Sequence, residues 1–534
     1  MEFSAREMDM PAWYEVPPGF EMPEYKDGMN YLTEGEVLTW SGDGVEVRSP
    51  LLFNDGSRIV APTIGTYPAL DEREAMRAMA SAERAYGGGA GAWPQMTVEQ
   101  RIEAVKGFVW RMRPLERQFV LLQMWETGKP FKACLDEFKR TLKYIEDTIV
   151  HLRKLEGESS GISKVDNYMF QVRRCPLGIS LCMGPFNYPL NETFALAIPA
   201  LIMGNSVIIK PPRYGALCTI PLLDAFASSF PPGVVNVING HGPTIIQPIM
   251  QSGKISIFGF TGSTSAARQI VDQHPANNRL RTILGLEAKN PAFVFADADL
   301  ALAVKECING ALEFNGQRCT AIKHIWVEES VVDQFLAIFS AEIEKVKCGM
   351  PWEEGVTITP LAEGNKSQWL AELVQDALDH GAHIVNPSGG KINGNLFHPT
   401  ILYPVAGDMK IWSVEQFGPL IPVSSFSHLD QICDYMINSE HGQQASVFTS
   451  SADNAAKMID MLVNQVSRVN LNAQCRRSPD ELPFTGRKDS AEGTLSVIDA
   501  LRSFSLRSLV VANEQGRELF FRTLESGQSK FLKI

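Results

Sequence analysis

The loop around Cys319 contains the side chain best suited to nucleophilic chemistry. Cys319 lies in Phe314-Asn-Gly-Gln-Arg-Cys-Thr320, between a segment with a helical pattern and one with a strand pattern. A thiol in such a glycine-containing loop can be partly exposed, and the neighbouring Arg318 favours the thiolate, which is the nucleophilic form. Judged on local sequence alone, a single cysteine is more often a small buried hydrophobic residue.

Asn187 is the second candidate, in the segment Met183-Gly-Pro-Phe-Asn-Tyr-Pro-Leu190. Prolines on both sides stiffen this segment, and a rigidly aimed side-chain amide can donate a hydrogen bond to an oxyanion. Taken alone, a loop asparagine is more often satisfied by neighbouring backbone groups.

Three further residues are suited to binding phosphates or ribose. Lys210 directly follows an apolar run, and Arg213 follows three residues later, so that two cations lie close together in the chain. Guanidinium groups bind phosphate bidentately. Ser263 lies in Phe-Thr-Gly-Ser-Thr between an expected strand and an expected helix, where a helix N-terminus can bind an anion.

The alternation of elements from residue 180 onward predicts the scaffold that positions these residues. Strand-like runs lie at 206–210, 234–238, 255–260 and 292–296, with helix-like stretches at 215–229, 242–252 and 264–273. Such alternation is typical of a parallel, doubly wound α/β sheet, which binds ligands at the carboxyl ends of its strands. A second α/β block is expected from about residue 293, with a helix at 300–314, a strand at 321–327 and a helix at 330–346.

Composition excludes several functional classes. The chain has 534 residues, of which 45% are hydrophobic, and 49 Lys and Arg against 61 Asp and Glu leave a net charge of −12. This acidity argues against nucleic-acid and anionic-membrane partners. Nine cysteines without a CxxC pair predict no metal site and fit a reducing compartment. The N-terminus contains acids and prolines where a signal peptide is basic and apolar, so we expect a cytoplasmic protein.

Taken together and in this order, the segments resemble the aldehyde dehydrogenase superfamily over roughly residues 45–512. The resemblance rests on the four segments above and on two later ones, Glu415-Gln-Phe-Gly-Pro419 and Pro483-Phe-Thr-Gly-Arg-Lys-Asp-Ser490. It implies an α/β fold with a Rossmann-type parallel-sheet cofactor domain, a second α/β catalytic domain and a small β oligomerisation arm. The expected domain boundaries are 1–164 and 177–292 for the cofactor domain (with 1–40 as an N-terminal arm), 293–484 for the catalytic domain, and 165–176 and 485–534 for the oligomerisation arm and C-terminal tail. A homodimer or homotetramer is expected.

The resemblance also implies a mechanism and a cofactor. Cys319 attacks the aldehyde carbon, the Asn187 amide and the Cys319 backbone N–H hold the oxyanion, and the resulting thioester is hydrolysed. NADP is favoured over NAD because Pro212 and Arg213 stand where an acidic residue would repel a 2′-phosphate, although NAD remains possible. The expected cofactor contacts are Lys210 with the adenosine ribose or its phosphate, Arg213 with a phosphate, Ser263 with a cofactor phosphate, Glu415 with the nicotinamide ribose and Phe417 packed beside that ribose.

One departure from the family concerns the carboxylate that activates the hydrolytic water. The family places this Glu four positions before a lysine, and alignment on Lys289 puts Gly285 at that position and Glu287 two residues later. Residues two apart in an extended strand face the same side, about 6–7 Å apart, so we expect Glu287 to act through a longer water bridge. Alternatively, Glu287 is structural and deacylation uses another base or acceptor.

Several details resemble the non-phosphorylating, NADP-dependent glyceraldehyde-3-phosphate dehydrogenase branch of this superfamily. That branch binds the substrate phosphate with arginines and a tyrosine, and the matching residues here are Arg140, Tyr188, Arg318 and Arg477. The leading hypothesis is therefore oxidation of a small phosphorylated aldehyde, glyceraldehyde 3-phosphate to 3-phosphoglycerate. The alternatives are a dehydrogenase of another small aldehyde or semialdehyde, a CoA-acylating aldehyde dehydrogenase, and a non-catalytic nucleotide-binding member.

Overall fold

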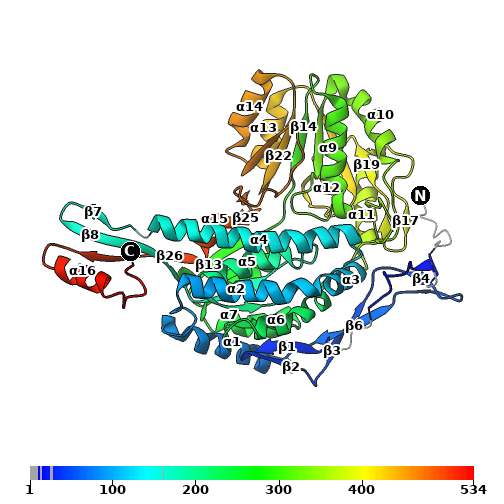
Figure 1. The fold of residues 1–534 in the computed structure, drawn as a ribbon. Helices are drawn as coiled ribbons and strands as arrows, with labels where there is room; N and C mark the ends of the chain where they lie inside the picture. Colours follow the sequence, from blue (N-terminus) through cyan, green and yellow to red (C-terminus); the bar gives the residue numbers. More distant parts are fainter. Residues whose placement is uncertain (1–9, 13–14, 24–27, 160, 534) are drawn as a thin grey trace.

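The computed structural model describes residues 10–12, 15–23, 28–159 and 161–533. Two lobes, each built on a mostly parallel sheet, lie one above the other in Figure 1, and a β arm projects from the lower lobe. This arrangement confirms the α/β fold with two parallel-sheet domains. No helix in the described ranges combines the length and the apolar character needed to cross a membrane.

The lower lobe contains an eight-stranded sheet in which the two strands that precede Lys210 and Ser263 each pair in parallel with the same central strand. In sheet order, the strands are β2 (Glu36–Thr39), β1 (Asn30–Thr33), β11 (Val235–Val237), β10 (Ser206–Ile209), β9 (Ile179–Met183), β12 (Ile255–Thr261), β13 (Arg281–Gly285) and β25 (Ala491–Glu492). All residues of β9 and β10 are buried, because helices cover both faces of a doubly wound sheet.

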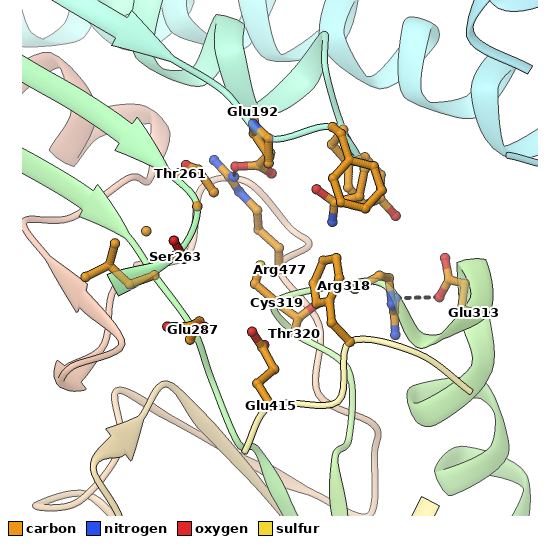
Figure 2. A pocket seen from close by; sticks show the side chains of 18 of the residues that line it. Glu192, Thr261, Ser263, Glu287, Glu313, Arg318, Cys319, Thr320, Glu415 and Arg477 are labelled. Atoms are coloured by element: carbon orange, nitrogen blue, oxygen red, sulfur yellow. Dashed lines mark hydrogen bonds and ion pairs between the residues drawn. The ribbon is translucent and has the colours of Figure 1, made fainter. Parts of the chain in front are cut away.

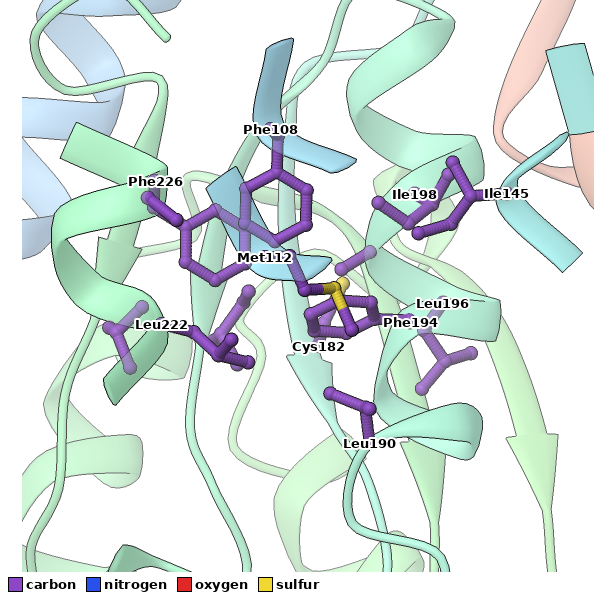
Figure 3. Close-up of a cluster of buried hydrophobic side chains, with 14 of the residues drawn as sticks. Phe108, Met112, Ile145, Cys182, Leu190, Phe194, Leu196, Ile198, Leu222 and Phe226 are labelled. Atoms are coloured by element: carbon purple, nitrogen blue, oxygen red, sulfur yellow. The ribbon is translucent and has the colours of Figure 1, made fainter. Parts of the chain in front are cut away.

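Helices of the lower lobe pack through a continuous apolar core. They are α1 (Glu72–Tyr86), α2 (Val98–Met112), α3 (Glu116–Thr127), α4 (Phe131–Ser159), α5 (Asn191–Ile202), α6 (Leu223–Ala227), α7 (Gly242–Gln251) and α8 (Thr264–Val271). Figure 3 shows Phe108 of α2 stacked on Phe226 of α6, with ring centroids 4.3 Å apart, and Phe194 of α5 beside them. Every residue of α5 is buried, so the loop before it rests on a rigid element.

The upper lobe has a seven-stranded sheet. Its strands, in sheet order, are β16 (His383–Ile384), β19 (Thr400–Tyr403), β20 (Leu420–Phe426), β15 (His324–Glu328), β14 (Pro291–Val294), β22 (Gln444–Phe448) and β23 (Arg468–Leu471). Its helices include α9 (Leu300–Leu312), α10 (Val332–Ile343), α11 (Lys366–Asp379), α13 (Leu429–Asn438) and α14 (Ala452–Leu462). Asp299 caps α9, since its carboxylate accepts the Leu302 N–H at 3.0 Å.

The arm is a three-stranded antiparallel sheet of β26 (Ser505–Ala512), β8 (Tyr168–Pro176) and β7 (Ser163–Val165). The C-terminal tail forms α16 (Arg517–Glu525), in which Phe520 and Leu524 pack with Ala512 at the end of β26. The tail therefore folds onto the arm (Figure 1).

Two segments lie elsewhere than expected. Residues 30–39, expected as part of an N-terminal arm, form the β1–β2 hairpin at the edge of the first sheet, because the turn Glu34–Gly35 adopts positive φ angles and the buried Leu32 pairs with Val237. The short strand β25, expected with the arm and tail, pairs with β13 in the same sheet.

The single helix expected over 215–229 is divided into a 3₁₀ segment, Leu217–Leu222, and α6, with Pro221 in the 3₁₀ segment.

Candidate active site

Loops from both lobes line a cavity of about 560 Å³, and ten of the twelve predicted site residues line it. In Figure 2, Cys319 lies near the centre, between Glu415 on one side and the Arg477–Glu192 pair on the other. The cavity residues from the prediction are Arg140, Asn187, Tyr188, Ser263, Glu287, Arg318, Cys319, Glu415, Phe417 and Arg477. Lys210 and Arg213 are not among the lining residues.

Two side chains from other parts of the upper lobe bind the backbone carbonyl of Cys319 and hold its loop in place. The loop after α9 turns through Phe314 and Asn315, both of which adopt positive φ angles. The Cys319 carbonyl then accepts hydrogen bonds from Lys323 Nζ and Asn290 Nδ2, each at 2.8 Å. These contacts fix the backbone of the loop, and hence the position of the sulfur atom, relative to the upper lobe.

Opposing effects act on the Cys319 thiol. Burial raises its pKa most, and the negative charge of Glu192 raises it further. The cations that lower this pKa most are Lys323 and Arg477. The sequence had assigned this role to Arg318, but the Arg318 guanidinium donates instead to Glu313 at 2.6 Å and to the Gly310 carbonyl at 3.1 Å.

Asn187 lies in the loop between β9 and α5. Its Nδ2 donates to the Gln317 carbonyl at 2.7 Å, which places the amide beside the nucleophile loop and leaves its second N–H for another acceptor. The backbone carbonyl of Asn187 accepts a hydrogen bond from Lys129 Nζ at 2.9 Å. Lys129 and Glu137 form a buried ion pair at 2.6 Å, and the sequence analysis missed both residues because nothing local relates them to Asn187.

Gly285 and Glu287 both line the cavity, but the Glu287 carboxylate is already engaged. Its Oε2 accepts the backbone N–H of Thr264, the first residue of α8, at 3.1 Å. Ser263 caps the same helix. The carboxylate therefore lies at the helix N-terminus that the sequence assigned to a cofactor phosphate, a position that suits either anion.

Lys210 lies at the carboxyl end of β10 and fits a phosphate or ribose partner. Within the described residues, its ammonium donates only to the Pro211 carbonyl, at 3.0 Å. Burial lowers its pKa to about 8, so an anionic partner would stabilise its charged form. Arg213 contacts the Tyr214 ring, and Phe186 lies between Tyr214 and the cavity residue Phe417, with ring centroids 5.9 and 6.0 Å apart.

Glu415 is oriented from two sides. Its carboxylate accepts from Ala288 N at 3.1 Å and forms an ion pair with Lys323 at 2.7 Å. Since Lys323 also binds the Cys319 carbonyl, the expected ribose ligand and the nucleophile share one cation. Within the part of the chain that is described, no group of three or more His, Cys, Asp or Glu side chains could hold a metal ion.

The arginines expected to bind a substrate phosphate converge on the cavity, but each has a carboxylate partner. Arg318 pairs with Glu313, whose side chain is 56% exposed. Arg477 pairs with the buried Glu192, which the sequence analysis missed although it lies only five residues after Asn187. Arg140 binds Asp480 through two hydrogen bonds of 2.6 and 3.0 Å.

Comparison with known proteins identifies the family that the chain resembles and several of its relatives. The aldehyde dehydrogenase family model matches residues 56–510. An NADP-dependent glyceraldehyde-3-phosphate dehydrogenase of Streptococcus equinus is 34% identical over 456 residues, covering 84% of this chain and 93% of that protein. A lactaldehyde dehydrogenase of Methanococcus aeolicus is 27% identical, covering 74% and 84%.

The fold agrees with this assignment. The crystal structure of an NADP-dependent glyceraldehyde-3-phosphate dehydrogenase from Bacillus halodurans in complex with NADP superimposes with a TM-score of 0.83 at 31% identity, covering 91% of this chain and 99% of that one. With the family model matching most of its length, this chain belongs to the aldehyde dehydrogenase family.

Proposed function

We propose that the protein is an NADP-dependent dehydrogenase that oxidises a small phosphorylated aldehyde, glyceraldehyde 3-phosphate, to the acid. The observation that carries this proposal is the convergence of Arg140, Arg318, Arg477 and Tyr188 on the cavity that contains Cys319. Guanidinium forks match phosphate geometry. Relatives named for this activity support the same conclusion.

In the proposed acylation step, the Cys319 thiolate attacks the aldehyde carbon. The free N–H of the Asn187 amide and the Cys319 backbone N–H stabilise the oxyanion that forms. NADP would supply the hydride acceptor when bound, and loss of a hydride from the reacting carbon would leave an acyl thioester on Cys319. Lys323 and Arg477 support the thiolate because their charges lower the thiol pKa.

For deacylation we propose Glu287 as the base that takes a proton from water. A cofactor phosphate bound at the N-terminus of α8 would compete with the Glu287 carboxylate for the Thr264 N–H. Repulsion between the two anions would release Glu287 into the cavity, where Gly285 leaves room beside it. Water then attacks the thioester, and the bond from sulfur to the acyl carbon breaks.

A specific observation favours a second candidate, oxidation of a small aldehyde that carries no phosphate. Arg140, Arg318 and Arg477 are each already paired with a carboxylate, so their charges are neutralised in this structure. A phosphorylated substrate has to displace these carboxylates. The pair of Arg318 opens most easily because Glu313 is solvent-exposed.

Steady-state kinetics with matched aldehydes test the proposal. Glyceraldehyde 3-phosphate, glyceraldehyde and lactaldehyde are compared, each with NADP and with NAD. We expect the highest kcat/KM for glyceraldehyde 3-phosphate with NADP, and a KM for it raised at least tenfold by Arg318→Ala. Arg153→Ala, at an exposed pair with Glu99, is the control. Equal kcat/KM for the phosphorylated and neutral substrates would establish the second candidate instead.

A further inference from the structure

A second cluster of arginines lies at the base of the arm, apart from the active-site cavity. Arg174 of β8, Arg502 of α15 (Val497–Ser503) and Arg507 of β26 line a separate cavity of about 420 Å³. The protein has a net charge of −12, so three arginines at one cavity form a positively charged region in an acidic protein.

Two of these arginines face each other across a strand pair. Arg507 and Arg174 are directly opposite in the antiparallel ladder of β26 and β8, so their side chains leave the sheet on the same face. Like charges directly opposite in a sheet destabilise it. Burial lowers the pKa of Arg174, and the charges of Arg502 and Arg507 lower it further.

Among the described residues, acidic side chains neutralise the cluster only in part. Arg502 has an ion pair with Asp499, at 3.4 Å. Within the described residues, Arg174 and Arg507 have no carboxylate within ion-pair distance. The cavity has one acidic lining residue, Glu158, which makes no ion pair with another described residue.

Backbone contacts hold the cluster in place. Arg174 Nη1 donates to the Arg502 carbonyl at 3.2 Å and to Ser505 Oγ at 3.1 Å, which leaves its other N–H groups free. Arg281 supports the same segment through 2.9 Å hydrogen bonds to the Ser503 and Ser505 carbonyls. The guanidinium of Arg174 is therefore positioned before any ligand arrives.

We propose that this cavity is a binding site for a small phosphate-bearing metabolite, separate from the catalytic site. Paired guanidinium groups bind phosphate through charge-assisted, bidentate hydrogen bonds. The cavity volume is in the range of small-molecule sites. The bound anion relieves the repulsion between Arg174 and Arg507 and ties β26 and β8 to the end of α15.

Calorimetric titration with inorganic pyrophosphate tests the site. The full-length wild type is compared with Arg507→Gln and Arg174→Gln. The control is Arg522→Gln, at an exposed arginine of α16 in the tail that packs on the arm. We expect at least tenfold weaker binding at one site per chain in the first two variants and affinity within twofold of wild type in the control. Equal pyrophosphate binding by wild type and Arg507→Gln would overturn the proposal.

Two further measurements distinguish a ligand site from a contact between subunits. In buffer free of phosphate and sulfate, Arg507→Gln should unfold at a higher temperature than wild type, because it removes the repulsion. If this variant instead changes the mass of the assembly in light scattering and pyrophosphate binds neither form, an acidic group of a second copy neutralises the cluster and the proposal is wrong. The KM for glyceraldehyde 3-phosphate should be unchanged in Arg507→Gln, so this test is independent of the proposed function.

Discussion

At the scale of single residues, the charge around Cys319 decides how the nucleophile behaves. Burial and Glu192 raise the pKa of the thiol, while Lys323 and Arg477 lower it. Glu192 is also the ion-pair partner of Arg477. The Glu192 carboxylate therefore raises the thiol pKa directly, and it also offsets the positive charge of Arg477 that lowers this pKa.

Glu192→Gln is therefore expected to make Cys319 more reactive at neutral pH. Removing the negative charge removes a contribution that raises the thiol pKa, and it leaves Arg477 with only its longer, 3.5 Å ion pair to Asp480, so the thiol pKa falls. The rate of alkylation by iodoacetamide, measured against pH, should shift to lower pH. Glu313→Gln, which alters another carboxylate of the same cavity, is the matched variant and should leave the profile in place. An unshifted profile in Glu192→Gln would contradict this account.

Glu287→Gln tests the proposed deacylation base. General-base catalysis contributes about 10²–10⁴-fold, so we expect kcat to fall by roughly 100-fold or more. Acylation remains intact, and rapid mixing should therefore show a burst of NADPH equal to the enzyme concentration, followed by slow turnover. A variant with wild-type kcat would show that Glu287 only caps α8 through Thr264.

At the scale of elements, buried contacts between helices and loops position the reacting groups. The Lys129–Glu137 pair joins the start of α4 to the loop before α5, since Glu137 Oε1 accepts the backbone N–H groups of Leu190 and Asn191 at 3.0 and 3.1 Å. Lys129 also lies 3.7 Å from the centre of the Tyr188 ring. One buried pair thus supports both the oxyanion residue and a substrate residue.

Lys129→Met should reduce stability and kcat together. Removing one partner of a buried ion pair leaves an uncompensated charge and costs about 3–5 kcal/mol. The substitution also removes the hydrogen bond from Lys129 to the Asn187 backbone carbonyl, so the Asn187 amide that binds the oxyanion is held less firmly. Thermal unfolding and steady-state kinetics measure the two effects. Lys132→Met, at an exposed pair with Asp136 one turn away, should cost less than about 1 kcal/mol. Comparable losses in the two variants would contradict the positioning role.

At the scale of the whole molecule, the arm leaves apolar side chains uncovered. Leu509 and Val511, two residues apart on the edge strand β26, are 56% and 50% exposed. An open edge strand with an apolar face invites pairing with another chain. The expected homodimer or homotetramer would use this strand.

Leu509→Glu combined with Val511→Glu should therefore give smaller assemblies. Charged side chains on an edge strand prevent edge pairing. Size-exclusion chromatography with light scattering should show a lower mass than that of the wild type at the same concentration. Leu519→Glu, at an exposed position of α16, controls for a general effect of charge on the arm and tail. An unchanged mass in the double variant would exclude β26 from the interface.

Much of the scaffold follows from local patterns in the sequence. The helix at 72–86 ends at Gly87, which adopts the left-handed conformation, and the strands at 206–209 and 255–261 lie where apolar runs predict them. The β1–β2 hairpin and β25 were not predicted in this sheet, because their strands are short and their partners are distant in the chain.

The sequence by itself determined the family, the parallel-sheet scaffold and most of the predicted residues that line the cavity around Cys319, because these depend on periodicity and on short motifs whose members are neighbours in the chain. Only the tertiary structure decided which charges meet. Arg477 pairs with Glu192 across 285 positions of sequence, and Arg140 pairs with Asp480 across 340. The pairing of Arg174 with Arg507 across the arm is likewise set by strand register. Such contacts depend on how separate elements pack, and the spacing of residues along one element does not contain that information.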